Sequence, residues 1–191
     1  MKHIMRATVT LACLFLAGAA LAQDATAPEQ KPATDESFPV SKKPVDGPYV
    51  KGTFGSWQIR CAKVQDGENC SLYQLIKDDT GNPTAEISIV ALPEGQEAKA
   101  GVSFVSPLGT LLNRGIAYSI DSDRARRYEF NWCDRGGCVA RFGFSAEEID
   151  FMKNGKSGTF TIVALAAPNN PVALKLPLDG FTEGWAALTK K

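Results

Sequence analysis

The run Trp57-Gln58-Ile59-Arg60-Cys61 alternates apolar and polar side chains, which is typical of a half-buried β-strand. In such a strand Trp57, Ile59 and Cys61 face the core, and the two polar side chains face water. Comparable short runs follow at residues 72–76, 87–91, 102–105, 116–120, 128–132, 139–144, 160–166 and 172–176. Turn-forming residues separate these runs, so roughly nine short strands predict an antiparallel β-sandwich or barrel.

Two short helices are expected among the strands. Residues 145–148 (Ser-Ala-Glu-Glu) have the form of a capping box, and Gly155 is a natural end for the helix that follows. Near the C-terminus Phe181, Trp185 and Leu188 recur at the spacing of one helical face. We expect both apolar faces to cover the core rather than to bind a partner.

The N-terminal residues 1–22 combine a basic start, an apolar run and a small-residue pattern at residues 20–22. This combination predicts a secretory signal peptide that is removed before Gln23. The apolar run has about 16 residues, fewer than the roughly 20 that a transmembrane helix needs. We therefore expect an exported protein with no membrane span after cleavage.

The segment after the predicted cleavage point differs in composition from the rest of the chain. Residues 23–50 hold five of the eleven prolines and few apolar side chains, which predicts a flexible Pro-rich linker. Residues 51–191 then form the folded domain. Basic and acidic residues balance at 21 each, so the chain lacks the basic excess that favours nucleic-acid binding.

Four cysteines follow the predicted cleavage point: Cys61, Cys70, Cys133 and Cys138. An even number in an exported chain argues for two disulfides, for which three connectivities exist. The short spacings favour the local pairs Cys61–Cys70 and Cys133–Cys138. A zinc site fits badly, because zinc-binding cysteines usually occur in pairs two to four residues apart. No metal or cofactor is expected.

Histidine chemistry is excluded if the signal peptide is removed, because the sole histidine is His3. Catalytic triads, Cys-His pairs and His-ligated metals all need an imidazole. Carboxylates remain: Asp121 and Asp123 could hold calcium or belong to a glycosidase-like pair. The simpler interpretation is a turn in which an aspartate bonds nearby backbone. We expect no enzymatic activity.

A cluster of cations, Arg124, Arg126 and Arg127, precedes the predicted strand at residues 128–132. In an otherwise balanced chain it could form a positive patch for an anionic glycan, lipid headgroup or protein. Alternatively, these side chains belong to the solvent-facing side of an amphipathic strand.

The order and spacing of several segments resemble the invasion-associated locus B family, exported proteins of Gram-negative bacteria. The resemblance covers residues 54–189. It rests on Phe54–Cys61, Cys70–Leu72, Ser106–Ile116, Phe130–Cys133, Gly137–Ala140 and Gly180-Phe181. Within this pattern residues 107–109 (Pro-Leu-Gly) predict a turn that leads residues 111–112 into a buried strand. Four aromatic residues would pack beside the two bridges: Phe54, Trp57, Phe130 and Trp132.

The resemblance implies a mainly β, immunoglobulin-like antiparallel β-sandwich with one or two short helices. It also implies a periplasmic, outer-membrane-associated or surface location, a part in host-cell invasion for pathogenic members, and no catalytic residues. The leading hypothesis is a non-enzymatic protein that contacts an unknown envelope or host-surface protein or glycan. The alternatives are a periplasmic structural or housekeeping envelope protein, or an envelope hydrolase that depends on Asp and Glu.

Overall fold

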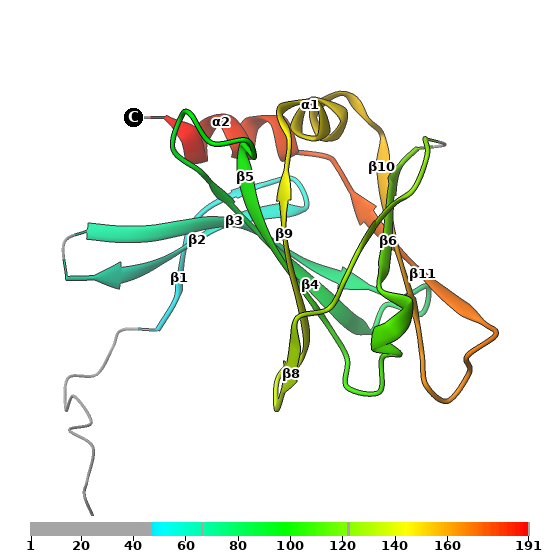
Figure 1. Ribbon diagram of the computed structural model, residues 1–191. Helices are drawn as coiled ribbons and strands as arrows, with labels where there is room; N and C mark the ends of the chain where they lie inside the picture. The colour runs from blue at the N-terminus through cyan, green and yellow to red at the C-terminus, as the bar shows by residue number, and fades with distance from the viewer. Residues whose placement is uncertain (1–46, 66, 122, 191) are drawn as a thin grey trace, which may run out of the picture. The chain divides into compact units, whose positions relative to one another are not determined.

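The computed structural model describes residues 47–65, 67–121 and 123–190. The predicted signal peptide and residues 23–46 of the predicted linker lie outside these ranges. Within them the chain forms two antiparallel sheets and two α-helices (Figure 1). The expected mainly β, antiparallel β-sandwich with two short helices is confirmed.

The larger sheet has the strand order β1-β2-β3-β4-β5-β9-β8. Its first five strands follow one another along the chain, so each pairs with the next through a hairpin. The strands are β1 (Tyr49–Phe54), β2 (Trp57–Val64), β3 (Gly67–Lys77), β4 (Pro83–Ala91), β5 (Ala100–Ser106), β8 (Trp132–Asp134) and β9 (Gly137–Phe144).

The smaller sheet has the order β11-β10-β6-β7. The chain enters it after β5, through the short 3₁₀ helix η1 (Leu112–Arg114), and returns to the larger sheet for β8 and β9. Its strands are β6 (Ile116–Ile120), β7 (Arg126–Tyr128), β10 (Ser157–Val163) and β11 (Pro171–Pro177). Helix α1 (Ala146–Asn154) joins β9 to β10, and α2 (Phe181–Thr189) follows β11.

The core lies between the two sheets and contains tightly packed aromatic rings. Phe104 of the larger sheet lies 4.5 Å from Phe160 of the smaller sheet, between ring centroids, and Tyr118 lies 4.7 Å from Phe160. Trp57 is fully buried at the start of β2, and its Nε1 donates a hydrogen bond to the Pro177 carbonyl of β11 at 3.1 Å. The indole therefore links the two sheets as well as filling the core.

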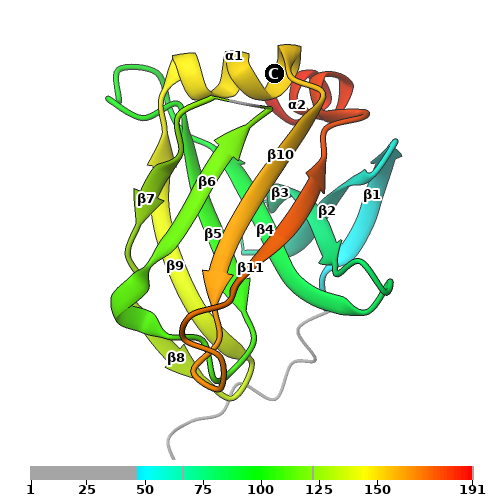
Figure 2. The ribbon, with the colours of Figure 1, turned by 90° about the vertical axis from the view of Figure 1, so that its right-hand side faces the viewer.

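The two ends of the sandwich differ. Figures 1 and 2 agree in showing α1 and α2 together at one end, while the β8–β9 hairpin, the η1 loop and the β10–β11 loop project from the other. We refer to these as the helix end and the loop end. This separation matters for function, because the two ends present different chemistry.

Both expected disulfides are present. Cys61 of β2 lies directly opposite Cys70 of β3, and Cys133 of β8 lies directly opposite Cys138 of β9, with 4.0 Å between the α-carbons of each pair. Each bridge therefore fastens one hairpin, as the local connectivity predicts.

The prediction of one strand at residues 128–132 is wrong. β7 ends at Tyr128 in the smaller sheet, and β8 begins at Trp132 in the larger one. The alternation of polar and apolar side chains continues across the gap, but the chain changes sheets there. As a result Trp132 is 39% exposed and does not join the core beside the bridges, whereas Trp57 does.

Two further expectations are corrected. Tyr49 and Val50 belong to β1, where Tyr49 pairs with Cys61, so the linker cannot extend to residue 50.

The turn at residues 107–109 is present, with Gly109 at a φ of 85°, a conformation that glycine adopts without strain. However, Leu112 lies in η1 and is 42% exposed instead of entering a buried strand.

The turn between β3 and β4 provides a test of local electrostatics. The Asp78 carboxylate accepts hydrogen bonds from the Thr80 hydroxyl at 2.7 Å and from the Thr80 and Asn82 backbone N–H groups at 2.9 Å each. These bonds, the Thr80 hydroxyl first among them, lower the pKa of Asp78 from 3.8 to about 2. The ionised form is therefore favoured in the folded state.

We expect this turn to lose its stabilising effect in acid. Because the folded pKa of Asp78 is depressed, its contribution is complete above about pH 4 and is lost as the pH falls towards about 2. Urea unfolding of the wild type and of Asp78→Asn should differ at neutral pH and converge near pH 2. A difference between the two proteins that is constant across this range would contradict the expectation.

Candidate functional site

A hollow with a volume of about 720 Å³ lies in the surface at the helix end. It is bounded by α1, by α2 and by the loop that joins β4 to β5, and we call it the helix groove. Its walls combine apolar side chains with charged ones. They comprise Ala91, Leu92, Pro93, Glu94, Lys99, Ala146, Ile149, Asp150, Lys153, Trp185, Leu188, Thr189 and Lys190.

Helix α1 begins where the sequence predicts. The Ser145 hydroxyl accepts a hydrogen bond from the Glu148 N–H at 3.2 Å, and the Glu148 carboxylate accepts one from the Ser145 N–H at 2.8 Å. This reciprocal capping box satisfies two N–H groups that a helix start leaves unpaired. The helix ends at Asn154, and the N–H of Gly155 donates to the Phe151 carbonyl.

The position after α1, occupied by Gly155, needs a glycine because of close packing, not because of its backbone conformation. Its φ is −75°, which any residue can adopt. A Cβ at this position would, however, lie 2.4 Å from Cγ2 of Ile120, so the glycine allows α1 to pack closely on the smaller sheet. This fixes the wall of the groove that α1 provides.

Helix α2 is held against the sandwich by Gly180 and Phe181. Gly180 has a φ of 80°, and a Cβ there would lie 2.1 Å from the Phe54 carbonyl oxygen. Phe181 is fully buried, with its ring centroid 5.2 Å from that of Trp57 in an edge-to-face arrangement. The expected apolar stripe is therefore divided: Phe181 enters the core, while Trp185 and Leu188 remain partly exposed along the groove.

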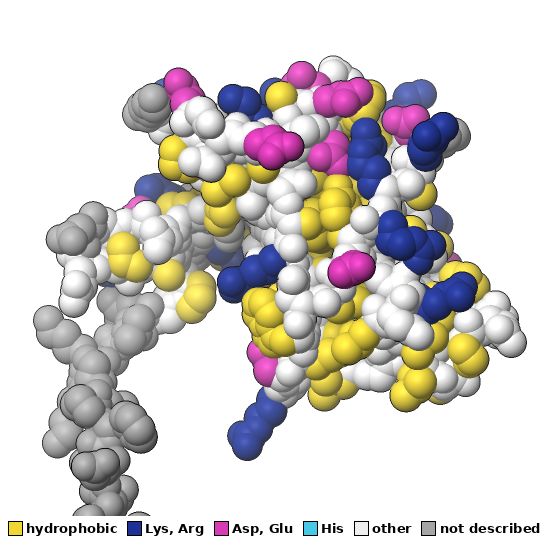
Figure 3. All heavy atoms as spheres, viewed as in Figure 1, with side chains coloured by type: hydrophobic (Ala, Val, Ile, Leu, Met, Phe, Trp, Pro, Cys, Tyr) yellow, Lys and Arg dark blue, Asp and Glu magenta, His cyan; other side chains and the backbone are white. Residues whose placement is uncertain are grey.

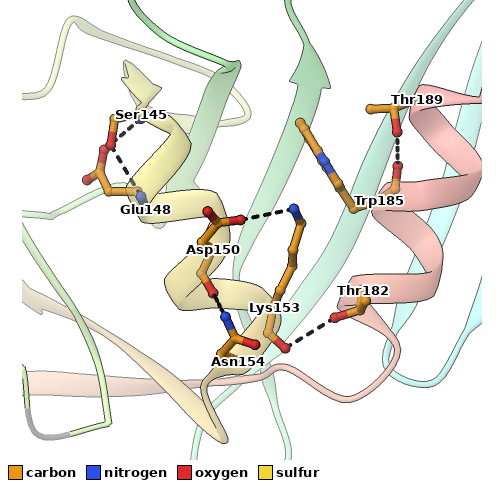
Figure 4. A network of polar contacts seen from close by, with 8 residues as sticks. All are labelled: Ser145, Glu148, Asp150, Lys153, Asn154, Thr182, Trp185 and Thr189. Carbon is orange, nitrogen blue, oxygen red and sulfur yellow. Dashed lines mark hydrogen bonds and ion pairs between the residues drawn. The ribbon is translucent and has the colours of Figure 1, made fainter.

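Charged side chains line the groove from α1, from the loop between β4 and β5, and from Lys190 just after α2. On α1, Lys153 pairs with Asp150 at 3.1 Å, and the Lys153 backbone carbonyl accepts a hydrogen bond from the Thr182 hydroxyl of α2 at 3.2 Å. Figure 4 shows these contacts and the Trp185 indole, which reaches from α2 into the space between the helices. Three lysines and two carboxylates line the groove in total.

Glu148 of α1 takes part in a partly buried network of polar contacts with β7. The Glu148 carboxylate accepts a hydrogen bond from the Tyr128 hydroxyl at 2.6 Å and pairs with the Arg126 guanidinium at 3.3 Å, although Glu148 is only 7% exposed. Burial, followed by the hydrogen bond to Glu148, raises the pKa of Tyr128. Burial also raises the pKa of Tyr118, whose hydroxyl is buried without a hydrogen-bond partner in the described chain.

We expect Glu148→Gln to destabilise the protein by about 1–2 kcal/mol, because it replaces charge-assisted hydrogen bonds and leaves Arg126 without its partner charge. The matched control is Glu147→Gln, which changes the neighbouring exposed carboxylate of the same helical turn. Chemical denaturation should show a clear loss for Glu148→Gln and little change for Glu147→Gln. Equal losses would show that the network contributes nothing specific.

The structure does not gather the three clustered arginines into one free patch. Arg126 is engaged by Glu148 and lies over the Phe151 ring, 5.5 Å from its centroid. The Arg127 guanidinium donates a hydrogen bond to the Arg114 carbonyl, and Arg124 is exposed in the loop before β7. A site for an anionic partner at these arginines stays a prediction.

The two aspartates considered for catalysis or calcium bind backbone instead. Asp121 accepts hydrogen bonds from the N–H groups of Ser157 at 3.0 Å and Lys156 at 3.2 Å, and Asp123 accepts one from the Arg124 N–H at 2.9 Å. The Asp123 contact agrees with the interpretation as a turn. Asp121 instead bonds backbone that is distant in sequence, at the start of β10.

In the described part of the chain, one set of His, Cys, Asp and Glu side chains lies close enough together to hold a metal ion: Cys61, Glu68 and Cys70. The two sulfur atoms of this set are bonded to each other, so neither offers a thiolate. Among the described residues, no helix is long and apolar enough to cross a membrane.

Sequence reasoning did not identify the helix groove. Its walls come from residues 91–99, 146–153 and 185–190, which are far apart along the chain. The apolar stripe of α2 is the one local signal. Trp185 and Leu188 are partly buried against the core, as expected, and they also line the groove, so the stripe alone does not indicate a second surface.

Comparison with known proteins agrees with this architecture. The chain is 30% identical over 135 residues to the invasion protein B homologs of Brucella abortus strain 2308 and biovar 1 strain 9-941, covering 69% of this chain and 75% of each relative. The crystal structure of invasion associated protein B from Bartonella henselae matches with a TM-score of 0.62 at 20% identity, covering 72% of this chain and 92% of that one.

The family model of the invasion associated locus B (IalB) protein matches residues 57–189, which include all of the described strands except β1, and both helices. The match therefore includes strands of both sheets, both disulfides and every wall residue of the helix groove except Lys190. The chain belongs to the invasion associated locus B family.

Proposed function

We propose that this chain is an exported, non-enzymatic protein of the bacterial envelope or surface that acts by binding another protein, and that the helix groove is its contact site. The observation that carries the proposal is the groove itself, a hollow of about 720 Å³ lined by the partly exposed Trp185. The chain belongs to an invasion-associated family, which supports a part in host-cell invasion for this contact. The N-terminal signal-peptide pattern supports export.

The chemistry of the groove favours a polypeptide over a glycan. Its apolar part consists mainly of aliphatic side chains, among them Leu92, Ile149 and Leu188, with Trp185 as its single aromatic ring. Aliphatic walls suit an apolar side chain of a partner, and tryptophan is the residue type that most often dominates protein–protein binding energy. Lysines and carboxylates around them suit the mixed charges of a peptide.

The two carboxylates of the groove give little support to a hydrolase. Asp150 is paired with Lys153 and its side chain is 64% exposed. A general acid of the glycosidase type needs an apolar setting that keeps its proton in place. The balanced charge of the chain also gives no support to nucleic-acid binding.

Site-specific photo-crosslinking in living cells tests the proposal. A photo-reactive amino acid at Leu188, inside the groove, should give a discrete adduct that a protease degrades. The same amino acid at Lys156, an exposed position just after α1 and outside the groove, is the matched control. Trp185→Ala in the Leu188 background should reduce the adduct by roughly tenfold or more, as expected for loss of an interface anchor.

The outcomes separate the alternatives. An adduct that resists protease but is removed by glycosidases would replace the protein partner with a glycan. Equal labelling from Leu188 and Lys156, or no adduct from either position, would contradict the groove as a contact site. The structural or housekeeping alternative would gain support in that case.

A further inference from the structure

The loop end of the sandwich carries a second surface with different chemistry. It consists of residues 107–115 between β5 and β6 and residues 164–170 between β10 and β11. Backbone hydrogen bonds fasten the two loops together, from the Leu111 N–H to the Val163 carbonyl and from the Leu165 N–H to the Gly109 carbonyl, each at 2.7 Å. The backbones of the two loops therefore brace each other and form one surface.

Leucines protrude from this surface. Leu165 is 63% exposed and Leu108 is 60% exposed, the highest values among the exposed large apolar residues of the described chain, and Leu112 is 42% exposed. Figure 3 shows apolar side chains gathered at this lower part of the molecule, with Lys or Arg side chains beside them. Large apolar side chains that are exposed together usually mark a binding surface.

The charges of the two loops have one sign. Neither loop contains Asp or Glu, and their one charged residue is Arg114. The Arg127 guanidinium bonds the Arg114 carbonyl, so a second cation lies next to the first. At the same end the β8–β9 turn exposes Arg135, while its neighbour Asp134 accepts a hydrogen bond from the Gly136 N–H at 2.7 Å.

We propose that the loop end docks onto a lipid surface that contains anionic phospholipid. The leucines would enter the boundary between headgroups and acyl chains, and the arginines would pair with headgroup phosphates. The loops project outward in Figures 1 and 2, a shape that suits insertion into a soft bilayer. The lack of carboxylates on the two loops removes the repulsion that an anionic surface would otherwise exert.

This docking would orient the molecule. The loop end and the helix end lie at opposite ends of the sandwich (Figure 2), so the helix groove would face away from the lipid. The inference does not rest on the groove, since it uses none of the groove's residues. Either proposal can fail while the other holds.

Flotation with lipid vesicles tests the proposal, using the protein purified from the cells that make it. Vesicles of phosphatidylcholine with added phosphatidylglycerol should carry the wild type upward, and vesicles of phosphatidylcholine alone should carry less. The double variant Leu108→Ser/Leu165→Ser should lower partitioning by roughly thirtyfold, because about three-fifths of each leucine is available for burial. Arg114→Gln should weaken binding to the anionic vesicles only.

The matched control is Val64→Ser/Val90→Ser, which removes two other exposed apolar side chains, 46% and 40% exposed, from the larger sheet. It should bind vesicles like the wild type, and all variants should keep their unfolding midpoints. Failure of the wild type to float, or an equal loss in the control, would overturn the proposal. Self-association that the two Leu→Ser changes abolish, without vesicle binding, would also overturn it and make the loop end an interface between copies.

Discussion

Replacing Trp57 by alanine is expected to lower the free energy of unfolding by about 3–5 kcal/mol, the cost of emptying a tryptophan site in a core. The indole is fully buried, contacts Phe181 at the base of α2 and donates a hydrogen bond to the Pro177 carbonyl of β11. The change therefore leaves a cavity where the larger sheet, β11 and α2 meet. It also removes one of the two side-chain hydrogen bonds to that carbonyl and leaves the one from Gln74.

Trp132 provides the matched control, because it is a tryptophan of the same sheet that is 39% exposed. Its removal should cost less than about 1 kcal/mol, as for most surface substitutions. Equilibrium unfolding in urea measures both values. Similar losses for the two variants would show that Trp57 does not occupy the centre of the core.

Removing the disulfides is expected to have the second largest effect. The bridges span 9 and 5 residues of sequence, and loop-closure entropy gives each a contribution of about 2–3 kcal/mol. Replacing Cys61 and Cys70 together by alanine should cost at least as much as replacing Cys133 and Cys138. The reason is that Cys61 is 1% exposed within the core, while Cys133 lies on the surface.

Double replacements avoid a free thiol that could form wrong bridges. Thermal unfolding of each double variant and of the wild type, with and without a reducing agent, compares the contributions. The reducing agent should lower the midpoint of the wild type and leave a variant that lacks both bridges unchanged. A wild-type midpoint that does not respond to reduction would contradict a stabilising role for the bridges.

Much of the fold could be predicted because strands that cover one core repeat a simple alternation. β2, β4, β5 and β6 follow this pattern, and the capping box locates α1 to the residue. The errors arise where a local pattern carries no information on partners. Residues 128–132 alternate like a strand, yet the chain leaves one sheet and joins the other within them.

The candidate site was harder to foresee, because it depends on packing between distant segments. Arg126 and Arg127 look alike in sequence, but strand alternation sends one towards Glu148 of α1 and the other towards the Arg114 carbonyl. The sequence predicts Glu148 as a capping residue. Its hydrogen bond to the Tyr128 hydroxyl cannot be inferred from spacing. The groove and the exposed leucines of the loop end likewise depend on which elements meet.

We propose that this family member acts in host-cell invasion through a protein contact at the helix groove. The most direct measurement is entry into cultured host cells by a deletion strain that carries the gene for the wild type, Lys153→Glu or Lys156→Glu. We expect the wild type and Lys156→Glu to restore entry and Lys153→Glu, which reverses a charge in the groove, to fail at equal protein levels. Full restoration by Lys153→Glu, or normal entry by the deletion strain itself, would contradict the account.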